Sequence, residues 1–291
     1  MSLADKLGYF AEEGLTVEIS DLRGGSQAVA ALTGESVDAV VGFYEHTIRT
    51  QARGKDLVMV ALFDRVPGLV MMIGTPHVDQ VHSIADLVGK PFGVTAPGSS
   101  TDAMVKYLLS KNGFDPQAIP VVTTGTTTMV AAIESGQVWG GVTVDPLAQK
   151  LVRDGTAQPL YDTRSAEGAR EVFGGPWPSG GLYVALRFSA ENPRTVQALV
   201  NATVRTLRYI GSHSAEEIAG HVPEFWVEGR RELYVEALEA NLGMFSPDGI
   251  MPEDGPPNVL ETLTLVDPTI DASTTDLART YDNSYVRKVP E

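Results

Sequence analysis

Cysteine is absent from the 291-residue chain, which excludes disulfide bonds, thiolate metal sites and cysteine nucleophiles together. Long apolar runs are missing as well, because no stretch approaches the roughly 18 residues that a membrane-spanning helix needs. The first residues show no basic segment followed by an apolar one, and we expect any export signal to lie outside this sequence. A chain of this length can bury a large core, so we expect a folded protein that is soluble in water.

Positive charge is scarce, because 22 Lys and Arg stand against 37 Asp and Glu and give a formal net charge of −15 at pH 7. Binding to nucleic acid requires clustered Lys and Arg, and here these residues are scattered. The composition therefore argues against a nucleic-acid partner and against a regulator that carries its own DNA-binding segment. An excess of acidic side chains is typical of a surface that keeps a protein in solution.

Signatures of catalysis are few. The sequence has no G-x-S-x-G elbow, no P-loop and no H-E-x-x-H zinc motif. Its five histidines are spread out, and none has the spacing of a metal-ligand cluster. Ser99, His46 and Glu45 supply the residue types of a nucleophile, a base and an acid, but no sequence feature brings them together. We therefore predict no enzyme activity, no cofactor and no bound metal.

What the sequence does contain is one pattern that occurs twice. The pattern aligns GGSQAVAALTGESVDAVVGFYEH (24–46) with GTTTMVAAIESGQVWGGVTVDPL (125–147). Each run contains a glycine turn with small hydroxyl residues, a short helix, a second turn and a β-rich segment. The pattern predicts helices over 26–33 and 127–134, and strands over 38–41 and 140–144.

The match extends upstream of both runs. A helix that ends at a glycine, Gly14 or Gly113, and continues into a strand is predicted by LADKLGYFAEEGLTVEI (3–19) and by TDAMVKYLLSKNGFDPQAIPVV (101–122). In the second copy a further strand, PFGVTAPGSS (91–100), precedes the helix. The repeat therefore predicts that a strand and its following loop precede Met1 in the complete first unit.

Repeated strand–helix–strand units predict an α/β protein with two similar lobes, each a mostly parallel sheet flanked by helices, and a ligand cleft between them. We assign residues 1–75 and 182–291 to lobe I and residues 76–181 to lobe II. The expected crossings between the lobes are 71–90, which leaves lobe I through a strand and reaches a short helix, and the Gly- and Pro-rich stretch 174–188. The later part of the chain is expected to pack around one lobe as helices over 190–212, 216–221, 230–242 and 274–286.

Three loops that follow predicted strands are hydroxyl-rich turns that open helices. Ligands of open α/β sheets bind beyond the carboxyl ends of the strands, and such turns favour an anionic or carbonyl oxygen. Helix capping is the simpler explanation of any one turn, yet three at equivalent positions of a repeat favour a binding site. The candidate contacts in these turns are Gly25, Ser26, Ser99, Ser100, Thr101 and Thr126.

The segment GFYEH (42–46), which follows the first predicted strand, has a different chemistry. Two aromatic rings, a carboxylate and an imidazole can form the wall and the polar contacts of a small-molecule pocket. Alternatively, these residues begin the next helix and only the phenylalanine is buried. An aspartate follows the equivalent strand of the second copy, and a tryptophan in the return crossing is a further candidate wall. The candidate contacts of this group are Gly42, Phe43, Tyr44, Glu45, Asp145 and Trp177.

Taken together, the sequence resembles the periplasmic substrate-binding proteins of ABC transporters, over nearly its whole length. The resemblance is strongest to the nitrate/sulfonate/taurine group, which is related to the NMT1/THI5-like proteins for thiamine-pyrimidine precursors. The pattern G-Y-F-x-x-E-G-L-x-V-E, followed by a Gly-Ser turn and A-L-x-x-G-x-x-D, is specific to that group. The segments that carry it are LADKLGYFAEEGLTVEI, GGSQAVAALTGESVDAVVG, SIADLVGKPFGVTAPGSSTDAMVKYLL and ENPRTVQALVNATVRTLRYI.

The resemblance implies a two-lobed periplasmic binding protein-like fold (type II) that closes on one small molecule and delivers it to an ABC permease in the membrane. It implies a protein that is periplasmic or exported and membrane-associated, and we expect a monomer. It implies ligand contacts at Gly25 and Ser26, Gly42 to Glu45, Ser99 to Thr101, and Asp145. The implied ligand is a small organic anion or a related molecule, either sulfonate-, taurine- or nitrate-like or aromatic and pyrimidine-type.

The residue types favour a ligand with two different ends. An aromatic or amine part would face Tyr44 and Glu45, and an acidic part would face Ser99 to Thr101, with Arg23 as the nearest cation. A pyrimidine-processing or other enzyme on the same fold is the alternative function. The fungal relatives that make the pyrimidine use a cysteine-rich motif, and the absence of cysteine excludes that chemistry here.

Overall fold

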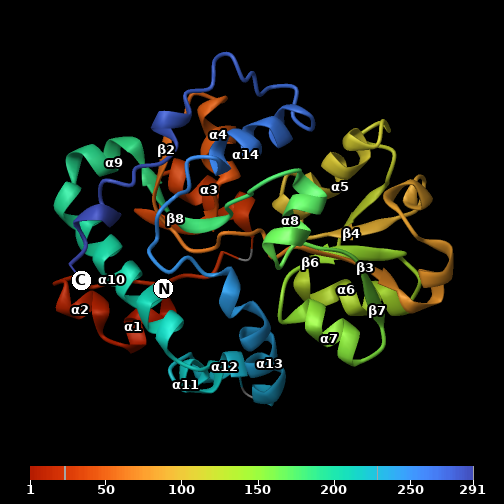
Figure 1. The fold of residues 1–291 in the computed structure, drawn as a ribbon, viewed down its shortest axis with the longest axis horizontal. Coiled ribbons are helices and arrows are strands. Elements are labelled where there is room, and N and C mark those ends of the chain that lie inside the picture. The colour runs from red at the N-terminus through yellow and green to blue at the C-terminus, as the bar shows by residue number, and fades with distance from the viewer. Residues whose placement is uncertain (23, 228, 291) are drawn as a thin grey trace.

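The computed structural model describes residues 1–22, 24–227 and 229–290. These residues form two lobes, each built around a β-sheet (Figure 1). The first sheet has three strands in the order β1-β8-β2, and the second has five in the order β5-β4-β6-β3-β7. Helices flank both sheets, which confirms the predicted α/β architecture with two lobes.

Lobe I contains the first copy of the repeat. Its elements are α1 (Ser2–Lys6), α2 (Tyr9–Glu12), α3 (Gly25–Thr33), β1 (Ala39–Phe43), α4 (Glu45–Gln51), β2 (Leu57–Leu62) and β8 (Gly180–Ala185). The returning strand β8 lies between β1 and β2 and is antiparallel to both. The two forward strands keep a common direction, but the direct pairings are antiparallel, which corrects the mostly parallel sheet predicted for this lobe.

Lobe II contains the second copy and a mixed sheet. Its elements are β3 (Val70–Gly74), η1 (Thr75–Gln80), η2 (Ile84–Leu87), β4 (Phe92–Val94), α5 (Ser100–Lys111), β5 (Val121–Thr123), α6 (Gly125–Glu134), β6 (Gly140–Thr143), α7 (Leu147–Arg153), β7 (Ala157–Asp162) and α8 (Ala166–Phe173). Strand β4 is parallel to β5 and β6, whereas β3 is antiparallel to β6 and β7. All of β3 is buried in this sheet, so the chain enters lobe II before residue 70, earlier than the predicted boundary at 75. A continuous apolar run of this kind needs cover on both faces.

Helices dominate the chain after β8. They are α9 (Leu186–Glu191), α10 (Pro193–Ser212), α11 (Ala215–Ala219), α12 (Glu224–Val227), α13 (Arg231–Asn241), η3 (Leu242–Met244), α14 (Gly255–Thr264), η4 (Leu277–Arg279) and η5 (Val286–Lys288). The helix predicted over 274–286 is wrong, because only short 3-10 turns form there. The Asp271 carboxylate accepts from the Ser273 N–H at 2.8 Å, and its carbonyl accepts from the Thr275 hydroxyl at 2.9 Å. Short polar side chains that bond nearby backbone in this way compete with helix formation.

The C-terminal helices contact both lobes, although the sequence predicted that they pack around one. Helix α13 lies beside α7 of lobe II, where Arg153 pairs with Glu236 at 3.6 Å. Helix α14 lies beside α4 of lobe I and α5 of lobe II, where the Ser110 hydroxyl donates to the Leu265 carbonyl at 3.2 Å. The two contacts are on opposite sides of the molecule, α14 at the top and α13 at the bottom of Figure 1.

Residues 15–22 form no strand, although the sequence predicts one after Gly14. In lobe II the corresponding strand, β5, is hydrogen-bonded to β4. Within the described ranges lobe I has no strand at the position of β4, and residues 16–20 make no backbone hydrogen bond. A single extended segment without a partner is not stable as sheet.

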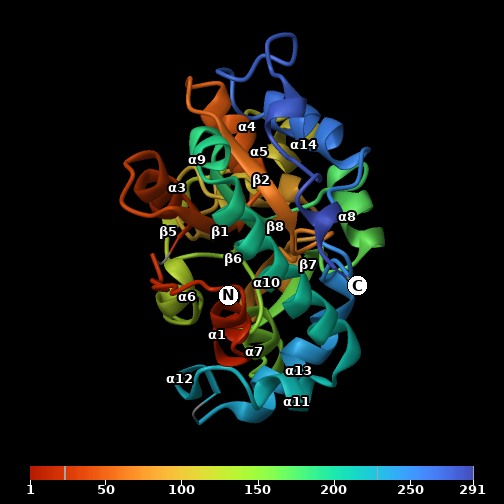
Figure 2. The same cartoon turned by 90° about the vertical axis from the view of Figure 1, so that its left-hand side faces the viewer.

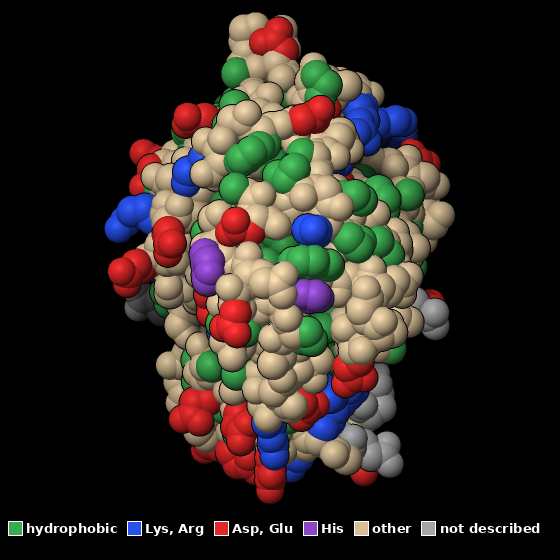
Figure 3. All heavy atoms as spheres, turned by 90° about the vertical axis from the view of Figure 1, so that its right-hand side faces the viewer, with side chains coloured by type: hydrophobic (Ala, Val, Ile, Leu, Met, Phe, Trp, Pro, Cys, Tyr) green, Lys and Arg blue, Asp and Glu red, His purple; other side chains and the backbone are tan. Residues whose placement is uncertain are grey.

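Large apolar side chains fill the interior of both lobes. Trp177, Tyr44 and Tyr183 are among the largest side chains that are fully buried. The outer face of lobe II (Figure 3) instead shows hydrophobic side chains interspersed with acidic and basic ones. Scattered apolar groups of this kind are normal on a protein surface.

Candidate functional site

A cavity of about 930 Å³ lies between the lobes and continues along the free edge of β1. Its interlobe end lies at the carboxyl ends of β1, β4 and β6, where α/β proteins bind their ligands. Both lobes contribute to its wall, lobe I through α3 and β1 and lobe II through the loop before α5. The residues that line this end are Gly24, Gly25, Gly42, Phe43, His46, Leu69, Thr95, Ser99, Ser100, Thr101, Val144 and Trp226.

The N-terminus of α3 borders the cavity without a cap. No described side chain caps it, and its first turn holds no acidic residue. Among the described residues, no backbone acceptor meets the N–H groups of Gly25, Ser26 and Gln27. A Cβ on Gly25 would stand 2.5 Å from Cε1 of His46, so glycine is what lets the imidazole lie against the helix end. Uncapped N–H groups at the positive end of a helix favour an anionic or carbonyl oxygen.

His46 is the buried polar side chain beside this turn. Its Nδ1 lies 3.3 Å from the Tyr183 hydroxyl, and its Nε2 has no hydrogen-bond partner among the residues that the structure describes. Burial lowers the pKa of His46 below its ordinary 6.5, while the neighbouring Glu45 acts in the opposite direction. The ring is therefore neutral at pH 7, and its Nε2 is available to a polar ligand atom as donor or acceptor.

The start of α5, on the other side of the cavity, has a different chemistry. The Ser99 hydroxyl accepts from the Asp102 N–H at 3.4 Å and lies 2.8 Å from the Thr101 hydroxyl. The buried Asp102 carboxylate accepts from the Gly98 N–H and from the Lys106 ammonium, both at 2.7 Å. The negative charge of this carboxylate already lies at the positive end of the helix dipole. In lobe II a ligand would therefore meet hydroxyl groups and not a free helix end.

Glu45 joins the two lobes behind the cavity wall. It is fully buried, and its Oε1 accepts a hydrogen bond of 2.6 Å from the Ser100 hydroxyl across the lobe boundary. The Arg49 Nε of the same helix lies 3.5 Å from its Oε2. The charge of Glu45 is thus balanced within the protein and does not line the cavity.

Tyr44 is also fully buried, and its hydroxyl bonds to that of Thr280 in the C-terminal segment. Burial raises the pKa of Tyr44. Both interpretations of the GFYEH segment therefore hold in part. Glu45 begins helix α4, yet it is Phe43 that stays partly exposed and lines the cavity, while the next residues are enclosed.

Half of the predicted contacts lie together in the cavity wall. These are Gly25, Gly42, Phe43, Ser99, Ser100 and Thr101. Ser26 belongs to the first turn of α3 but is exposed outside the cavity. The side chains of Thr126 and Arg23 lie outside the described part of the structure.

Two further predicted contacts are engaged elsewhere. The Asp145 carboxylate accepts from Arg164 at 3.0 Å and from the Asn241 amide at 2.5 Å. Trp177 is buried in the core and stacks on Phe173, with ring centroids 4.8 Å apart. Neither lines the cavity, and the function proposed below does not use them.

Several residues that line the cavity are not among the twelve predicted contacts. The sequence does propose the His46 imidazole, as part of the GFYEH segment, as a possible polar contact, and it lines the cavity. Thr95 and Val144 directly follow β4 and β6, so the strand-end rule reaches them as well. Trp226 comes from α12 in the helical tail, far from both repeats, and no local pattern points to it.

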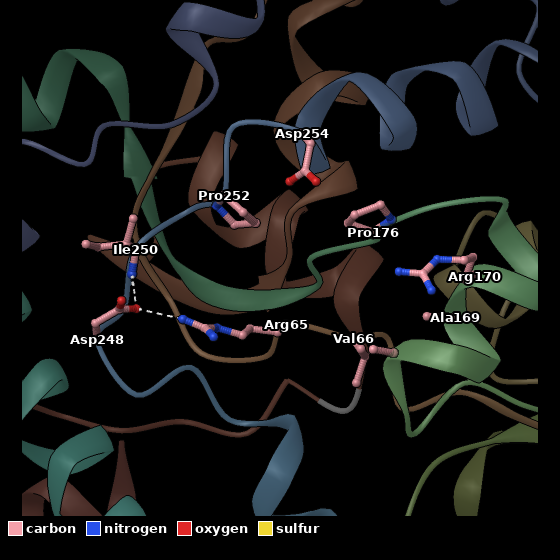
Figure 4. A pocket seen from close by; sticks show the side chains of 10 residues that line it. Arg65, Val66, Ala169, Arg170, Pro176, Asp248, Ile250, Pro252 and Asp254 are labelled. Carbon is pink, nitrogen blue, oxygen red and sulfur yellow. Dashed lines mark hydrogen bonds and ion pairs between the residues drawn. The ribbon is translucent and has the colours of Figure 1, made fainter.

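A second cavity, of about 350 Å³, lies at another junction of the lobes (Figure 4). Figure 4 shows Ala169 and Arg170 of α8 facing residues of the crossing after β2 and of the segment before α14. Arg65 pairs there with Asp248 at 3.3 Å, and both are about half exposed. None of its described lining residues has a buried polar atom without a partner, in contrast to His46 in the larger cavity.

The described ranges contain no group of three His, Asp or Glu side chains that could hold a metal ion. Their helices include none that combines the length and apolar character needed to cross a membrane.

The sequence has known relatives. The model of the NMT1/THI5-like family matches residues 1–217. A protein of solved structure from Bordetella bronchiseptica RB50 is 38% identical, with a TM-score of 0.93 over 99% of this chain and 91% of that one. Among curated protein sequences none matches significantly.

Two periplasmic binding proteins share the fold at lower identity. The alkanesulfonate-binding protein SsuA from Xanthomonas axonopodis pv. citri, bound to MOPS, is 19% identical with a TM-score of 0.68, over 97% of this chain and 93% of that one. The periplasmic nitrate-binding protein NrtA from Synechocystis PCC 6803 is 16% identical with a TM-score of 0.70, over 99% of this chain and 81% of that one. These likenesses confirm the periplasmic binding protein fold. Because the family model spans most of its length and the Bordetella relative is 38% identical, the chain belongs to the NMT1/THI5-like family.

Proposed function

We propose that this protein is the solute-binding receptor of an ABC importer, and that it captures a small organic anion between its two lobes. The observation that carries the proposal is the interlobe cavity, with the uncapped end of α3 on one side and the hydroxyls of Ser99 and Thr101 on the other. The similarity in fold to SsuA and NrtA supports the same function. We infer that a membrane permease receives the ligand, and that the protein works as a monomer outside the cytoplasm.

The anionic end of the ligand is proposed to lie at α3. Within the described part of the chain, three N–H groups have no acceptor and the Nε2 of the neutral His46 has no partner, and these groups provide the donors there. The side chains of Phe43, Leu69 and Val144 supply an apolar wall for the rest of the molecule. Such a site suits an alkanesulfonate, an aromatic carboxylate or a similar acid. It suits an aminopyrimidine less well, because the Glu45 carboxylate that would bind an amine is occupied by Ser100.

Closure of the lobes around the ligand is proposed to give the receptor its signal. The Glu45–Ser100 hydrogen bond crosses the boundary between the lobes next to the cavity, so it forms only when the lobes are together. A ligand that contacts both walls stabilises this arrangement and shifts the population toward it. The permease can then distinguish the loaded receptor from the empty one.

Calorimetry on protein stripped of ligand tests the proposal. The panel contains ethanesulfonate, taurine, nitrate, benzoate and an aminopyrimidine, and we expect at least one acid to bind. Ser99→Ala is expected to lower the affinity for that acid about tenfold, since it removes one hydrogen bond in an enclosed site. Ser26→Ala is the matched control, because this serine also stands at a helix start but is exposed outside the cavity.

Two outcomes would contradict the proposal. If the acids of the panel do not bind, the anion receptor is wrong, and if Ser99→Ala binds as the unaltered protein does, the assigned contact is wrong. Mass spectrometry of the ligand after long incubation addresses the rival enzyme function. An unchanged ligand favours the receptor, whereas conversion into a product favours an enzyme on the same fold.

A further inference from the structure

Trp226 lines the interlobe cavity from outside the two copies of the repeat. It belongs to the short helix α12, and its side chain is 39% exposed although it is large and mostly apolar. The next residue, Val227, is instead buried. A single exposed ring is ordinary on a protein surface, but a ring in the wall of a cavity lies where a ligand can cover it.

Helix α12 is part of a larger helical segment. This segment, the strap, consists of residues 213–227 and 229–242 and contains α11, α12 and α13. Both α11 and α12 pack on α13. The Arg231 guanidinium of α13 donates to the Glu216 carboxylate at 2.8 Å and to the Ala219 carbonyl at 3.2 Å. Packing within the strap therefore positions Trp226, since a helix as short as α12 is not stable alone.

The strap is attached to both lobes. On the side of lobe I, His221 packs edge-on against Tyr209 of α10, with ring centroids 5.9 Å apart, and α10 packs on β2. On the side of lobe II, the Asn241 amide at the end of α13 donates to the Asp145 carboxylate at 2.5 Å. Asp145 directly follows Val144, which lines the cavity. The strap thus reaches the rim of the proposed ligand site.

The ring of Trp226 and the proposed anion contacts belong to one cavity. Figure 1 shows α12 below the lobes, between α1 and α13, and Figure 2 shows it on the same side of the molecule as α3 and α6. Gly25 at the start of α3 and Trp226 both line the cavity. An acid held at α3 can therefore extend its apolar part toward the strap.

The size and the lining of the cavity favour an acid with a large apolar part. An acid as small as ethanesulfonate fills little of about 930 Å³ and would leave Phe43 and Trp226 in contact with water. Two aromatic side chains in one wall favour a flat ring system. Offset or edge contacts between rings add attraction beyond the burial of apolar area.

We propose that Trp226 selects the ligand by its apolar end, and that the protein prefers acids with a flat aromatic ring, which rests on the receptor function proposed above. The N–H groups at the start of α3 bind the acid group, and the aromatic ring stacks against Trp226. An acid without a ring makes only the first of these contacts.

Calorimetry with two sulfonates tests the selection, because the acid group is the same and only the apolar part differs. We expect 2-naphthalenesulfonate to bind at least about tenfold more tightly than ethanesulfonate, since its rings bury more apolar area. Trp226→Ala should lower the affinity for 2-naphthalenesulfonate about tenfold and change that for ethanesulfonate less than about twofold. Trp226→Phe keeps an aromatic face and should retain most of the preference.

Two controls separate selection from damage to the fold. Trp226→Ala should melt within roughly 2 °C of the unaltered protein, because the side chain is partly exposed. Trp139→Phe changes a tryptophan that stacks on His77, with ring centroids 4.0 Å apart, and does not line the cavity. It should leave the affinities for both sulfonates unchanged.

Fluorine NMR of the protein labelled with 5-fluorotryptophan tests the contact itself. The chain has three tryptophans, so three signals are expected, and the signal of Trp226 is the one that Trp226→Phe removes. Saturation with 2-naphthalenesulfonate should shift this signal more than saturation with ethanesulfonate does, because a stacked ring changes the local magnetic field. The signal of Trp139 should stay in place.

The outcomes distinguish this inference from the receptor function. If both sulfonates bind with equal affinity, or if Trp226→Ala lowers both affinities equally, selection by Trp226 is wrong and the receptor function stands. An unshifted Trp226 signal at saturation would likewise overturn the contact. If neither these sulfonates nor the acids of the first panel bind, the receptor function and the selection by Trp226 are both wrong.

Discussion

The strands β1 and β6 occupy the same place in the two copies of the repeat, yet their surroundings differ. Strand β6 lies between β3 and β4, and a Cβ on Gly140 would overlap the carbonyl oxygen of Met72 in β3. Strand β1 has one neighbour and carries Ala39 and Val40 where the repeat aligns Gly140 and Gly141. The comparison indicates that Gly140 and Gly141 are needed because strands lie close on both sides of β6. Neither the turn nor the ligand site requires glycine at these positions.

The largest expected effect follows from this difference. Gly140→Ala should lower the free energy of unfolding by about 3 kcal/mol, because the added methyl group meets backbone that cannot move aside. The reverse change in lobe I, Ala39→Gly, should cost about 1 kcal/mol through chain flexibility alone. Urea unfolding of both variants at one temperature measures the two values. Losses of equal size would refute the link between these glycines and the second neighbouring strand.

Much of the architecture could be predicted from the sequence because it depends on local pattern. The helices α3 and α6 and the strands β1 and β6 lie within a few residues of the ranges that the repeat predicts. The place of β8 inside the first sheet could not be predicted, since it depends on which edge a distant strand reaches. For the same reason the contact of α13 with lobe II, made by Glu236, was not foreseen.

The candidate site could be predicted in composition but not in orientation. The hydroxyls of Ser99 and Thr101 follow a strand, and the strand-end rule places them in the cavity wall. At the junction of β1 and α4, however, successive side chains point in directions that the packing of the whole lobe decides. This is why Phe43 lines the cavity while Tyr44 and Glu45 turn into the protein.

A carboxylate follows each of the equivalent strands, and the two have different partners. Asp145, after β6, accepts from Arg164 at 3.0 Å, from the Asn241 amide at 2.5 Å and from the Gln149 N–H at 2.9 Å. Glu45, after β1, accepts one hydrogen bond from the opposite lobe. Asp145 therefore anchors the helical tail to lobe II, whereas Glu45 links the lobes to each other.

Isosteric amides distinguish these two carboxylates. Asp145→Asn should cost about 2 kcal/mol of unfolding free energy, because an amide nitrogen would face donors that now meet a charged oxygen. Glu45→Gln should cost about 1 kcal/mol, since the amide oxygen can still accept from Ser100 and Arg49 keeps its pair with Asp267 at 2.9 Å. Urea unfolding of each variant and of the unaltered protein measures which substitution costs more unfolding free energy. A larger loss of unfolding free energy for Glu45→Gln would show that the hydrogen bond between the lobes stabilises the protein more than the contacts of Asp145 with the helical tail.

The smallest expected effect concerns the junction where the lobes meet. Asp64 lies in the crossing that leaves β2, and its backbone bonds to the return crossing, with the N–H donating to Gly180 at 3.0 Å and the carbonyl accepting from Ser179 at 2.9 Å. Burial raises the pKa of the Asp64 carboxyl from its ordinary 3.8 to about 7. The folded protein therefore holds this proton over a pH range in which the unfolded chain has released it.

Between pH 4 and pH 7 the unfolded state loses the Asp64 proton and the folded state keeps it, so rising pH favours unfolding. Asp64→Asn removes this dependence. The variant should match the unaltered protein near pH 4 and exceed its stability by about 1 kcal/mol at pH 8, a value reduced by partial contact with solvent. Thermal unfolding of both proteins across this range measures the difference, and His46, which titrates in the same way in both, cancels from it. A gap that is constant from pH 4 to pH 8 would mean that Asp64 is ionised in both states, and that the junction of the lobes does not exclude charge.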